Sequence, residues 1–323
     1  MDLTQRMDPE LVAAYREVPP KGFVDWEDLP ETRVFFEQMT ADIPDSENVT
    51  KEDRTVPGPE GAPEVPVRVY RPVESSGILP GVLWIHGGGY IVGSVDQEDL
   101  VSQNVTEAVE CVVVSVDYRL APEHPFPAPL EDCYAALKWM ASNAGDLGVD
   151  PARIAITGPS AGGGLTAGLA LLVRDRGEVA VAFQAPIYAM IDDRNETPSA
   201  HANGTSRIWS RQDNENGWNA YLGNGAGKAG VSPYAAAARA TDLSGLPPAY
   251  LAVGTLDIFL DENVGYARRL IEAGVPTELH VYPGLIHGSD TFLPGAASSQ
   301  RLIADRNAAL KRALHPQSVA IPG

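Results

Sequence analysis

A serine, an acid and a histidine that could form a catalytic triad occur in the chain order Ser160, Asp257, His287. Ser160 is the centre of a G-x-S-x-G motif, Gly158-Pro159-Ser160-Ala161-Gly162, between a short β-rich run at 154–157 and an apolar run of helical length. Such a nucleophile elbow holds the serine oxygen out of the turn, above the end of a sheet. The alternative is a glycine-rich turn at a helix start, so the motif needs support from the rest of the chain.

The acid and the base follow the serine in the order typical of enzymes built on a nucleophile elbow. A serine hydroxyl is a strong nucleophile only when an imidazole accepts its proton and a carboxylate orients that imidazole. Asp257 comes directly after a strand-like run at 249–253. Asp261 is the competing acid, but it stands just before a helical pattern and is better explained as a cap or first-turn residue. We therefore favour Asp257.

His287 is the histidine best placed to act as the base. It lies in a glycine-flanked loop just past a strand-like run at 278–282, on the same sheet edge as the serine and the acid. Of the other histidines, His280 lies inside a strand-like run, and His86 is better explained as an anchor of a loop. The remaining three fit surface loops or the chain end; they are His124, His201 and His315. Because the base must be neutral, activity should rise through a pH near 6.5, the ordinary imidazole pKa.

A glycine-rich loop, His86-Gly87-Gly88-Gly89, follows the strand-like run that ends at Ile85. Consecutive glycines let a loop approach the serine with its N–H groups exposed, and such groups stabilise the oxyanion formed when a carbonyl is attacked. Together with the N–H after the nucleophile, here Ala161, this element is typical of lipases and esterases. A merely flexible glycine loop is the alternative, but four elements in the right order favour a site for acyl transfer.

The elements that position these residues alternate between strands and helices. Strand-like runs at 54–56 and 65–70 alternate apolar and polar residues, whereas those at 81–86 and 111–117 are continuously apolar, as strands covered on both faces are. Further strands at 154–157, 180–185, 249–253 and 278–282 alternate with helical patterns at 130–141, 165–174, 264–273 and 298–313. This order predicts an α/β protein with a mixed, mostly parallel sheet flanked by helices, whose ligand crevice lies at the carboxyl ends of the strands.

One long stretch breaks the alternation and predicts a helical cap. Residues 187–242 show no strand pattern, and a structureless loop that long is unusual in a compact domain. Residues 1–47 carry short amphipathic patterns and several prolines, which predicts a helical arm that joins the cap. The α/β core is then built from residues 48–186 and 243–323.

The composition excludes several classes of partner. The chain of 323 residues has 43 acidic and 24 basic side chains, a formal net charge of -19, which disfavours nucleic acid and anionic membranes. Its two cysteines, Cys111 and Cys133, lie in apolar patterns and predict buried thiols rather than a disulfide framework or a metal site. With no leader pattern and no apolar run of bilayer length, we expect a cytoplasmic protein without a membrane span.

These motifs together resemble the hormone-sensitive-lipase family of esterases, over about residues 48–313. The resemblance is carried by the glycine loop 86–90, the run Asp117-Tyr118-Arg119-Leu120-Ala121-Pro122-Glu123-His124-Pro125-Phe126-Pro127-Ala128, the elbow, and Asp257 with Asp261-Glu262. The segments 160–164, 240–248 and 287–289 are similar to the bacterial heroin-esterase branch of that family in particular.

The resemblance implies an α/β-hydrolase fold with a helical cap, no cofactor, and hydrolysis of short acyl esters. It implies Ser160, Asp257 and His287 as the triad, with the amides of Gly88, Gly89 and Ala161 as the oxyanion hole. It also suggests a homodimer formed through the last strand, 278–282. The chain departs from the family at Pro159, where an acidic residue is usual, and at Ile258 and Leu260, where Pro and Arg are usual.

The run at 117–128 has a structural interpretation, because its prolines set a rigid turn. We expect Arg119 and Glu123 within it to form a partly buried ion pair. Tyr90, Tyr188 and Trp209 are candidates for the substrate pocket, with Trp26 and Trp218 beside them, although packing in the core or the cap explains these aromatic residues equally well.

The sequence thus predicts a serine carboxylesterase that hydrolyses short, acetyl-like esters, including those of aromatic alcohols, through an acyl-enzyme. An amidase or peptidase on the same fold is the alternative within catalysis. A non-catalytic ligand receptor is the alternative outside it, since fold alone does not fix function. Such receptors commonly lack the base, and this chain retains His287.

Overall fold

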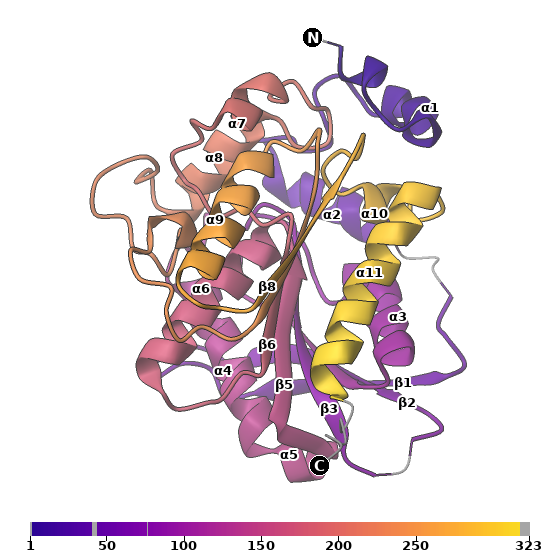
Figure 1. Cartoon of the computed structure of the whole chain (residues 1–323), viewed down its shortest axis with the longest axis vertical. Helices are drawn as coiled ribbons and strands as arrows, with labels where there is room; N and C mark the ends of the chain where they lie inside the picture. The colour runs from indigo at the N-terminus through magenta and orange to yellow at the C-terminus, as the bar shows by residue number, and fades with distance from the viewer. Residues whose placement is uncertain (1, 41–43, 76, 317–323) are drawn as a thin grey trace, which may run out of the picture.

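The computed structural model describes residues 2–40, 44–75 and 77–316 and is built on a single eight-stranded sheet (Figure 1). The strand order is β1-β2-β4-β3-β5-β6-β7-β8. The strands are β1 Val49–Val56, β2 Val65–Pro72, β3 Leu79–Ile85, β4 Val112–Val116, β5 Val149–Pro159, β6 Phe183–Ile187, β7 Ala249–Gly254 and β8 Thr277–Tyr282. β2 runs antiparallel to β1 and β4, and the strands from β4 to β8 are parallel. The predicted mixed, mostly parallel sheet is confirmed.

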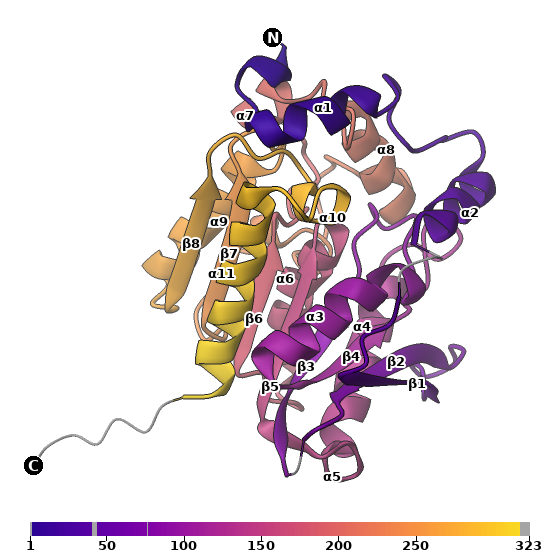
Figure 2. The ribbon, with the colours of Figure 1, turned by 90° about the vertical axis from the view of Figure 1, so that its right-hand side faces the viewer.

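The helices form two layers on the faces of the sheet. Figures 1 and 2 show α3 and α11 on one face, and α4, α6 and α9 on the other. These five helices are α3 Asp99–Val109, α4 Ala128–Ser142, α6 Ala161–Arg176, α9 Leu260–Glu272 and α11 Ala297–Leu314. Every residue of β4, β6 and β7 is buried, as expected for strands covered on both faces. β1, at the edge, is mostly exposed.

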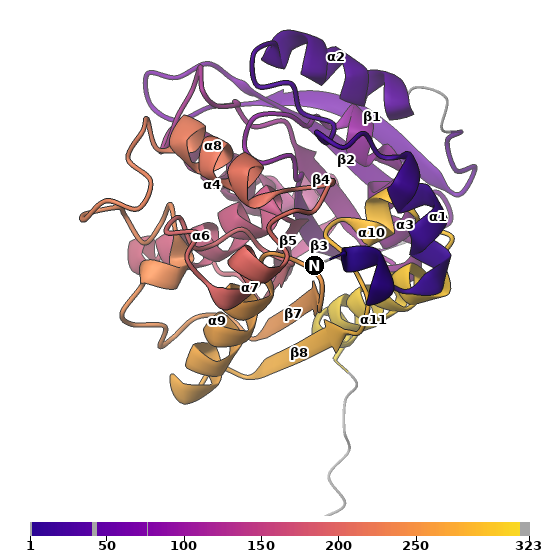
Figure 3. The ribbon, with the colours of Figure 1, turned by 90° about the horizontal axis from the view of Figure 1, so that it is seen from above.

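Several of the shorter helices lie beyond the carboxyl ends of the parallel strands. Seen from above, α1, α7 and α8 lie over that end of the sheet, with α2 beside them (Figure 3). These and the remaining short elements are η1 Leu3–Gln5, α1 Pro9–Glu17, α2 Leu29–Thr40, η2 Asp96–Glu98, α5 Ala144–Leu147, α7 Pro198–Ala202, α8 Arg211–Tyr221, η3 Ala237–Arg239 and α10 Ser289–Phe292. The stretch without a strand pattern supplies α7, α8 and η3. None of the described helices is long and apolar enough to cross a membrane.

Two features of the core were not predicted. α3 connects β3 to β4 although no helix was expected between them, and β4 lies between β2 and β3 in the sheet. The thiols of Cys111 and Cys133 are buried and free, as predicted.

Candidate active site

The turn between β5 and α6 forces Ser160 into an unusual backbone conformation. Its φ is 57° and its ψ is -120°, a region that residues with a side chain seldom adopt and that costs about 1–3 kcal/mol. The Ser160 N–H donates to the carbonyl of Ile187 at 2.9 Å, and the Ser160 carbonyl accepts from Gly164 and Met190. These bonds to α6 and to the end of β6 hold the strained turn in place.

The two glycines of the elbow are required by close backbone contacts. A Cβ on Gly158 would lie 2.1 Å from the carbonyl oxygen of Ile85, and one on Gly162 would lie 2.0 Å from the same atom. The end of β3 therefore packs directly against the elbow, and this brings the glycine loop that follows β3 next to Ser160.

The structure brings Ser160, His287 and Asp257 together in one line of hydrogen bonds. Ser160 Oγ lies 2.9 Å from His287 Nε2, and His287 Nδ1 lies 2.8 Å from Asp257 Oδ2. Asp257 is fully buried, while Ser160 and His287 are 8% and 6% exposed. A proton can thus pass from the serine to an imidazole whose opposite nitrogen faces a carboxylate.

Several contacts fix the acid and the imidazole in this line. The second carboxylate oxygen of Asp257 accepts the N–H of Phe259 at 2.9 Å, which orients the carboxylate. The rings of Phe259 and Tyr188 meet the His287 ring edge-on, with centroids 5.1 and 5.0 Å away. Asp257 follows β7 and His287 follows β8, so both reach Ser160 from neighbouring strand ends.

Asp261 lies away from His287, in the first turn of α9. Its carboxylate accepts the N–H of Ser199 at 2.6 Å, and its own N–H donates to the Ser199 hydroxyl. It therefore joins α9 to α7, consistent with the first-turn role expected for it.

The glycine loop presents free N–H groups beside Ser160. Gly88 and Gly89 have positive φ values of 103° and 59°. Among the described residues, no backbone carbonyl accepts the N–H of either glycine. Ala161 is the first residue of α6, so its N–H has no partner within the helix. The three amides named by the family resemblance therefore remain available to an oxyanion.

His86 is a buried neighbour of the glycine loop. Its ring stacks on Tyr118 at 3.9 Å, and its Nδ1 lies 2.7 Å from the Gly87 carbonyl. The Tyr118 hydroxyl also donates to the His86 carbonyl. Burial lowers the pKa of His86 to about 4, so it is neutral at pH 7. This geometry fits an anchor of the loop.

A cavity of about 340 Å³ opens onto Ser160 and His287. Besides the elbow and the loop after β8, the parts of the chain that line it include the N-terminal arm, the glycine loop, η2, the segment after β6 and α10. The lining is Val24, Phe36, Met39, Thr40, Gly87, Gly88, Gly89, Val92, Gly93, Gln97, Glu98, Pro159, Ser160, Tyr188, Ile208, Trp209, His287, Gly288, Thr291 and Phe292. It is largely apolar, which suits the acyl or alcohol part of an ester.

The aromatic candidates for the pocket separate in the structure. Tyr188 and Trp209 line the cavity, and Trp209 lies so close to Gly89 that a Cβ there would meet its ring at 2.2 Å. Tyr90 does not line it; this side chain is fully buried, stacks on Tyr221 at 4.0 Å and donates its hydroxyl to the Met190 carbonyl. Trp218 is fully buried as well.

The prediction that Arg119 and Glu123 pair with each other is wrong. Arg119 forms a two-pronged contact with the buried Asp132 of α4, at 2.8 Å from each nitrogen. Glu123 instead pairs with Arg33 of α2, at 2.9 and 2.8 Å. Asp132 and Glu123 thus each pair with an arginine from another element, and the local sequence does not show which arginine that is.

Sequence reasoning also missed Glu98, the acidic residue of the cavity lining. Its carboxylate accepts the indole N–H of Trp84 at 2.7 Å. Burial raises the pKa of Glu98 to about 7. The signal in the sequence that could have pointed to Glu98 as a cavity residue is its position soon after the glycine loop.

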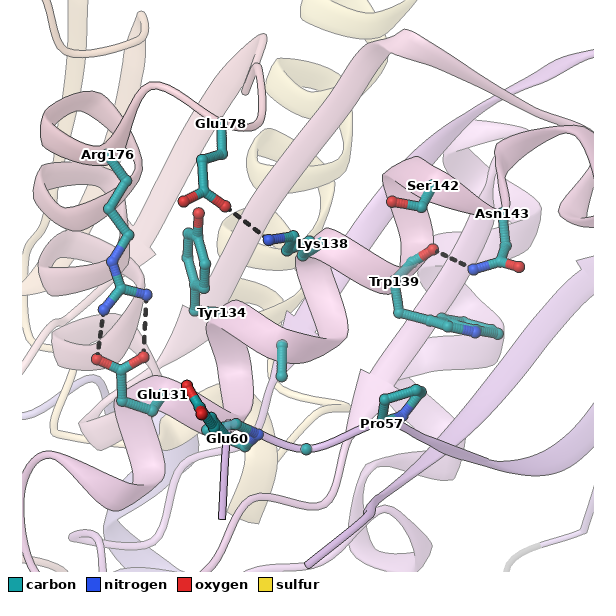
Figure 4. Close-up of a pocket in the computed structure, with 13 residues that line it drawn as sticks. Pro57, Glu60, Glu131, Tyr134, Lys138, Trp139, Ser142, Asn143, Arg176 and Glu178 are labelled. Atoms are coloured by element: carbon teal, nitrogen blue, oxygen red, sulfur yellow. Dashed lines mark hydrogen bonds and ion pairs between the residues drawn. The ribbon is translucent and has the colours of Figure 1, made fainter. Parts of the chain in front are cut away.

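A second cavity, of about 500 Å³, lies away from the triad, beside α4 and the end of α6 (Figure 4). Its main charged side chains neutralise one another, because Arg176 pairs with Glu131 and Lys138 pairs with Glu178. Neither a histidine nor a residue of the elbow is among the residues that line this second cavity.

Comparisons with known proteins agree with this geometry. A family model described as the alpha/beta hydrolase fold matches residues 82–291. Carboxylesterase NlhH of Mycobacterium tuberculosis is 40% identical over 267 residues, which are 82% of this chain and 83% of that protein. The arylesterase of Saccharolobus solfataricus is 34% identical over 252 residues, covering 77% of this chain and 79% of that one.

The solved structure titled bacterial heroin esterase matches with a TM-score of 0.92 and 41% identity, covering 96% of this chain and 99% of that chain. These relatives are named as esterases, and the match extends over the strands that carry Ser160, Asp257 and His287. The chain therefore belongs to the hormone-sensitive-lipase family of α/β hydrolases and is a carboxylic ester hydrolase.

Proposed function

We propose that this enzyme hydrolyses short-chain acyl esters through an acyl-enzyme formed on Ser160. The observation that carries the proposal is the line of hydrogen bonds from Ser160 through His287 to Asp257 at the floor of an apolar cavity. The modest volume of the cavity, about 340 Å³, supports a short acyl chain. Tyr188 and Trp209 in its lining support alcohols that carry an aromatic ring.

In the first half of the reaction, Ser160 Oγ attacks the ester carbonyl carbon while His287 Nε2 takes the serine proton. The carbonyl oxygen becomes an oxyanion, which accepts hydrogen bonds from the amides of Gly88, Gly89 and Ala161. Collapse of this intermediate breaks the bond to the alcohol oxygen, and His287 gives that oxygen its proton. Asp257 keeps the imidazole in the tautomer that the transfer needs.

In the second half, water attacks the acyl carbon on Ser160 and His287 accepts a proton from the water. The second oxyanion uses the same three amides. Its collapse releases the carboxylic acid, and the proton on His287 returns to Ser160 Oγ.

Initial rates on a p-nitrophenyl ester series from acetate to dodecanoate, with wild type beside Ser160→Ala, test the proposal. We expect the rates to peak at the short esters and to vanish in the variant. A matched acetate ester and acetamide separate an esterase from an amidase. Absence of turnover by the wild type, with ester-like ligands still bound, would favour the receptor alternative.

We also propose a cytoplasmic location and a homodimer through β8. The two free, buried thiols support a reducing compartment. β8 is the last strand of the sheet, which supports pairing with a second copy.

A further inference from the structure

Glu98 is the one acidic residue among the described residues that line the active-site cavity, and that lining contains no lysine or arginine. It is the last residue of η2, which follows the glycine loop. A carboxylate in a largely apolar cavity is costly unless something in the site or in the ligand compensates it. Its surroundings therefore bear on which substrates the cavity accepts.

The protein holds the Glu98 carboxyl group with hydrogen bonds but without a direct ion pair. The indole of Trp84 donates to one oxygen at 2.7 Å, and the backbone N–H of Gly87 also stabilises the charged form. Arg306 lowers the pKa of Glu98 only at longer range, since its guanidinium lies over the Trp84 ring and faces Asp290 at 3.9 Å. Among the described residues, no lysine or arginine forms an ion pair with Glu98.

Glu98 lines the same cavity as Ser160 and His287. Gly87, whose N–H faces Glu98, is so near the elbow that a Cβ on it would lie 3.6 Å from Ser160 Cβ. An ester bound at Ser160 therefore shares its cavity with Glu98.

The rest of the cavity suits an alkylammonium group. Phe36, Tyr188, Trp209 and Phe292 contribute aromatic rings to the lining. Aromatic faces attract cations through their quadrupole, and a carboxylate adds a full opposite charge. Because the pocket supplies both, the free-energy cost of moving a cation out of water is lower here than in a purely apolar cavity.

We propose that Glu98 determines specificity by favouring esters with an alkylammonium group near the scissile bond. The inference rests on the proposed ester hydrolysis at Ser160. It assigns Glu98 to substrate selection and leaves the bond-breaking steps to the groups described above.

The selection should depend on pH. Burial raises the pKa of Glu98 to about 7; the Trp84 indole, the Gly87 amide and Arg306 act against this rise, and Asp290 adds to it. Glu98 is thus mostly neutral at pH 6 and mostly charged at pH 8. The preference for a cationic ester over a neutral one should increase across this interval.

Acetylcholine and its carbon isostere 3,3-dimethylbutyl acetate form a matched pair of probes, since they differ in the charge of one atom. We would measure kcat/KM for acetylcholine divided by kcat/KM for 3,3-dimethylbutyl acetate in wild type, Glu98→Gln and Asp96→Asn. Asp96 is the control because it is exposed, bound to Arg68 and outside the cavity lining. We expect Glu98→Gln to lower the ratio about tenfold and Asp96→Asn to leave it as in wild type.

The wild type alone gives a second readout, which does not depend on the folding of a variant. Its ratio should rise several-fold between pH 6 and pH 8, and the effect of His287 cancels because both esters use the same base. An equal ratio in wild type and Glu98→Gln, or a wild-type ratio independent of pH, would overturn the inference.

Failure of the proposed function gives a different result, namely no Ser160-dependent turnover of either ester or of p-nitrophenyl acetate. Calorimetric binding of the two esters to Ser160→Ala still tests the inference in that case. We expect tighter binding of acetylcholine than of its isostere, and loss of the difference when Glu98→Gln is added.

Discussion

Asp257 and Asp261 are four residues apart, yet their surroundings give them different tasks. Asp257 is fully buried and faces His287, whereas Asp261 binds the N–H of Ser199 at the start of α9. An amide in place of the orienting carboxylate favours the wrong imidazole tautomer, and such a change costs about 10⁴-fold in kcat in serine proteases.

We therefore expect Asp257→Asn to lower kcat by about 10³- to 10⁴-fold. Asp261→Asn is the matched control and should stay within about threefold of wild type, because it alters only the contact between α9 and α7. Steady-state rates on p-nitrophenyl acetate provide the measurement. Equal losses in the two variants would reject Asp257 as the orienting acid.

His86 should make the folded state sensitive to acid. Burial lowers its pKa to about 4, while an unfolded chain has the ordinary value of about 6.5. Between these values the unfolded state binds a proton that the folded state does not, so stability falls as pH drops from 6.5 to 4. Wild type should lose about 2–3 kcal/mol more than His86→Gln between pH 7 and 4.5.

Urea unfolding at the two pH values measures this difference. Comparing the change with pH, rather than the stability at one pH, removes the cost of the lost packing against Tyr118. Parallel pH dependences in wild type and His86→Gln would show that His86 is protonated in the folded state.

The positions of single residues that belong to a sequence motif could be predicted, whereas the positions that depend on packing between distant segments could not. The proximity of Ser160, Asp257 and His287 could be predicted because strand ends place the three residues at one edge of the sheet. Tyr90 was assigned to the pocket, but its φ of 68° and its stacking on Tyr221 turn it into the core. Arg119 was paired with Glu123, whereas the fold offers it Asp132, thirteen residues on.

Among the elements, α2 contacts the core both through apolar side chains such as Phe36 and through Arg33. Its side chain donates to the Ile91 carbonyl at 2.8 Å and to the Ala121 carbonyl at 3.1 Å, besides pairing with Glu123. α2 in turn contributes Phe36 and Met39 to the cavity lining. Arg33 therefore connects the arm to the substrate site.

Arg33→Ala should loosen this attachment and lower kcat/KM for short esters about tenfold, mainly through KM, because the cavity loses part of its wall. Arg16→Ala, a change of the same kind in α1, serves as the control and should have little effect. Faster proteolysis within residues 20–40 of Arg33→Ala is the structural readout. An unchanged KM together with unchanged proteolysis would contradict this role.

The sequence patterns identified most elements but not their order in space. β4 inserts between β2 and β3, a crossover that local periodicity cannot report, since pairing joins segments distant in the chain. α3, with the sequence DLVSQNVTEAV, was missed because Ser, Asn and Thr weaken its helical pattern, although its buried residues lie along one side. Packing against α11 compensates for that weak propensity.

For the molecule as a whole, β8 leaves one edge of the sheet without a partner strand in the described chain. Val281 on this strand is 41% exposed. The homodimer through β8 stays a prediction. Light scattering should give about twice the 34.4 kDa of one chain, and Val281→Lys should shift the mass toward the monomer. A monomeric wild type would exclude the dimer.

The segment between β6 and β7 bears on how such enzymes diversify. Those strands are neighbours, and the pairing of Gln184 with Ala249 and of Ile187 with Ala252 fixes where the segment leaves the sheet and returns. The entropy of closing a loop grows only slowly with its length. Evolution or an engineer can therefore graft a different segment, carrying its own counterpart of Trp209, between the same two strand ends. The part of the cavity lining that this segment supplies, which includes Tyr188 and Trp209, can in this way change while the strand ends that carry the triad stay the same.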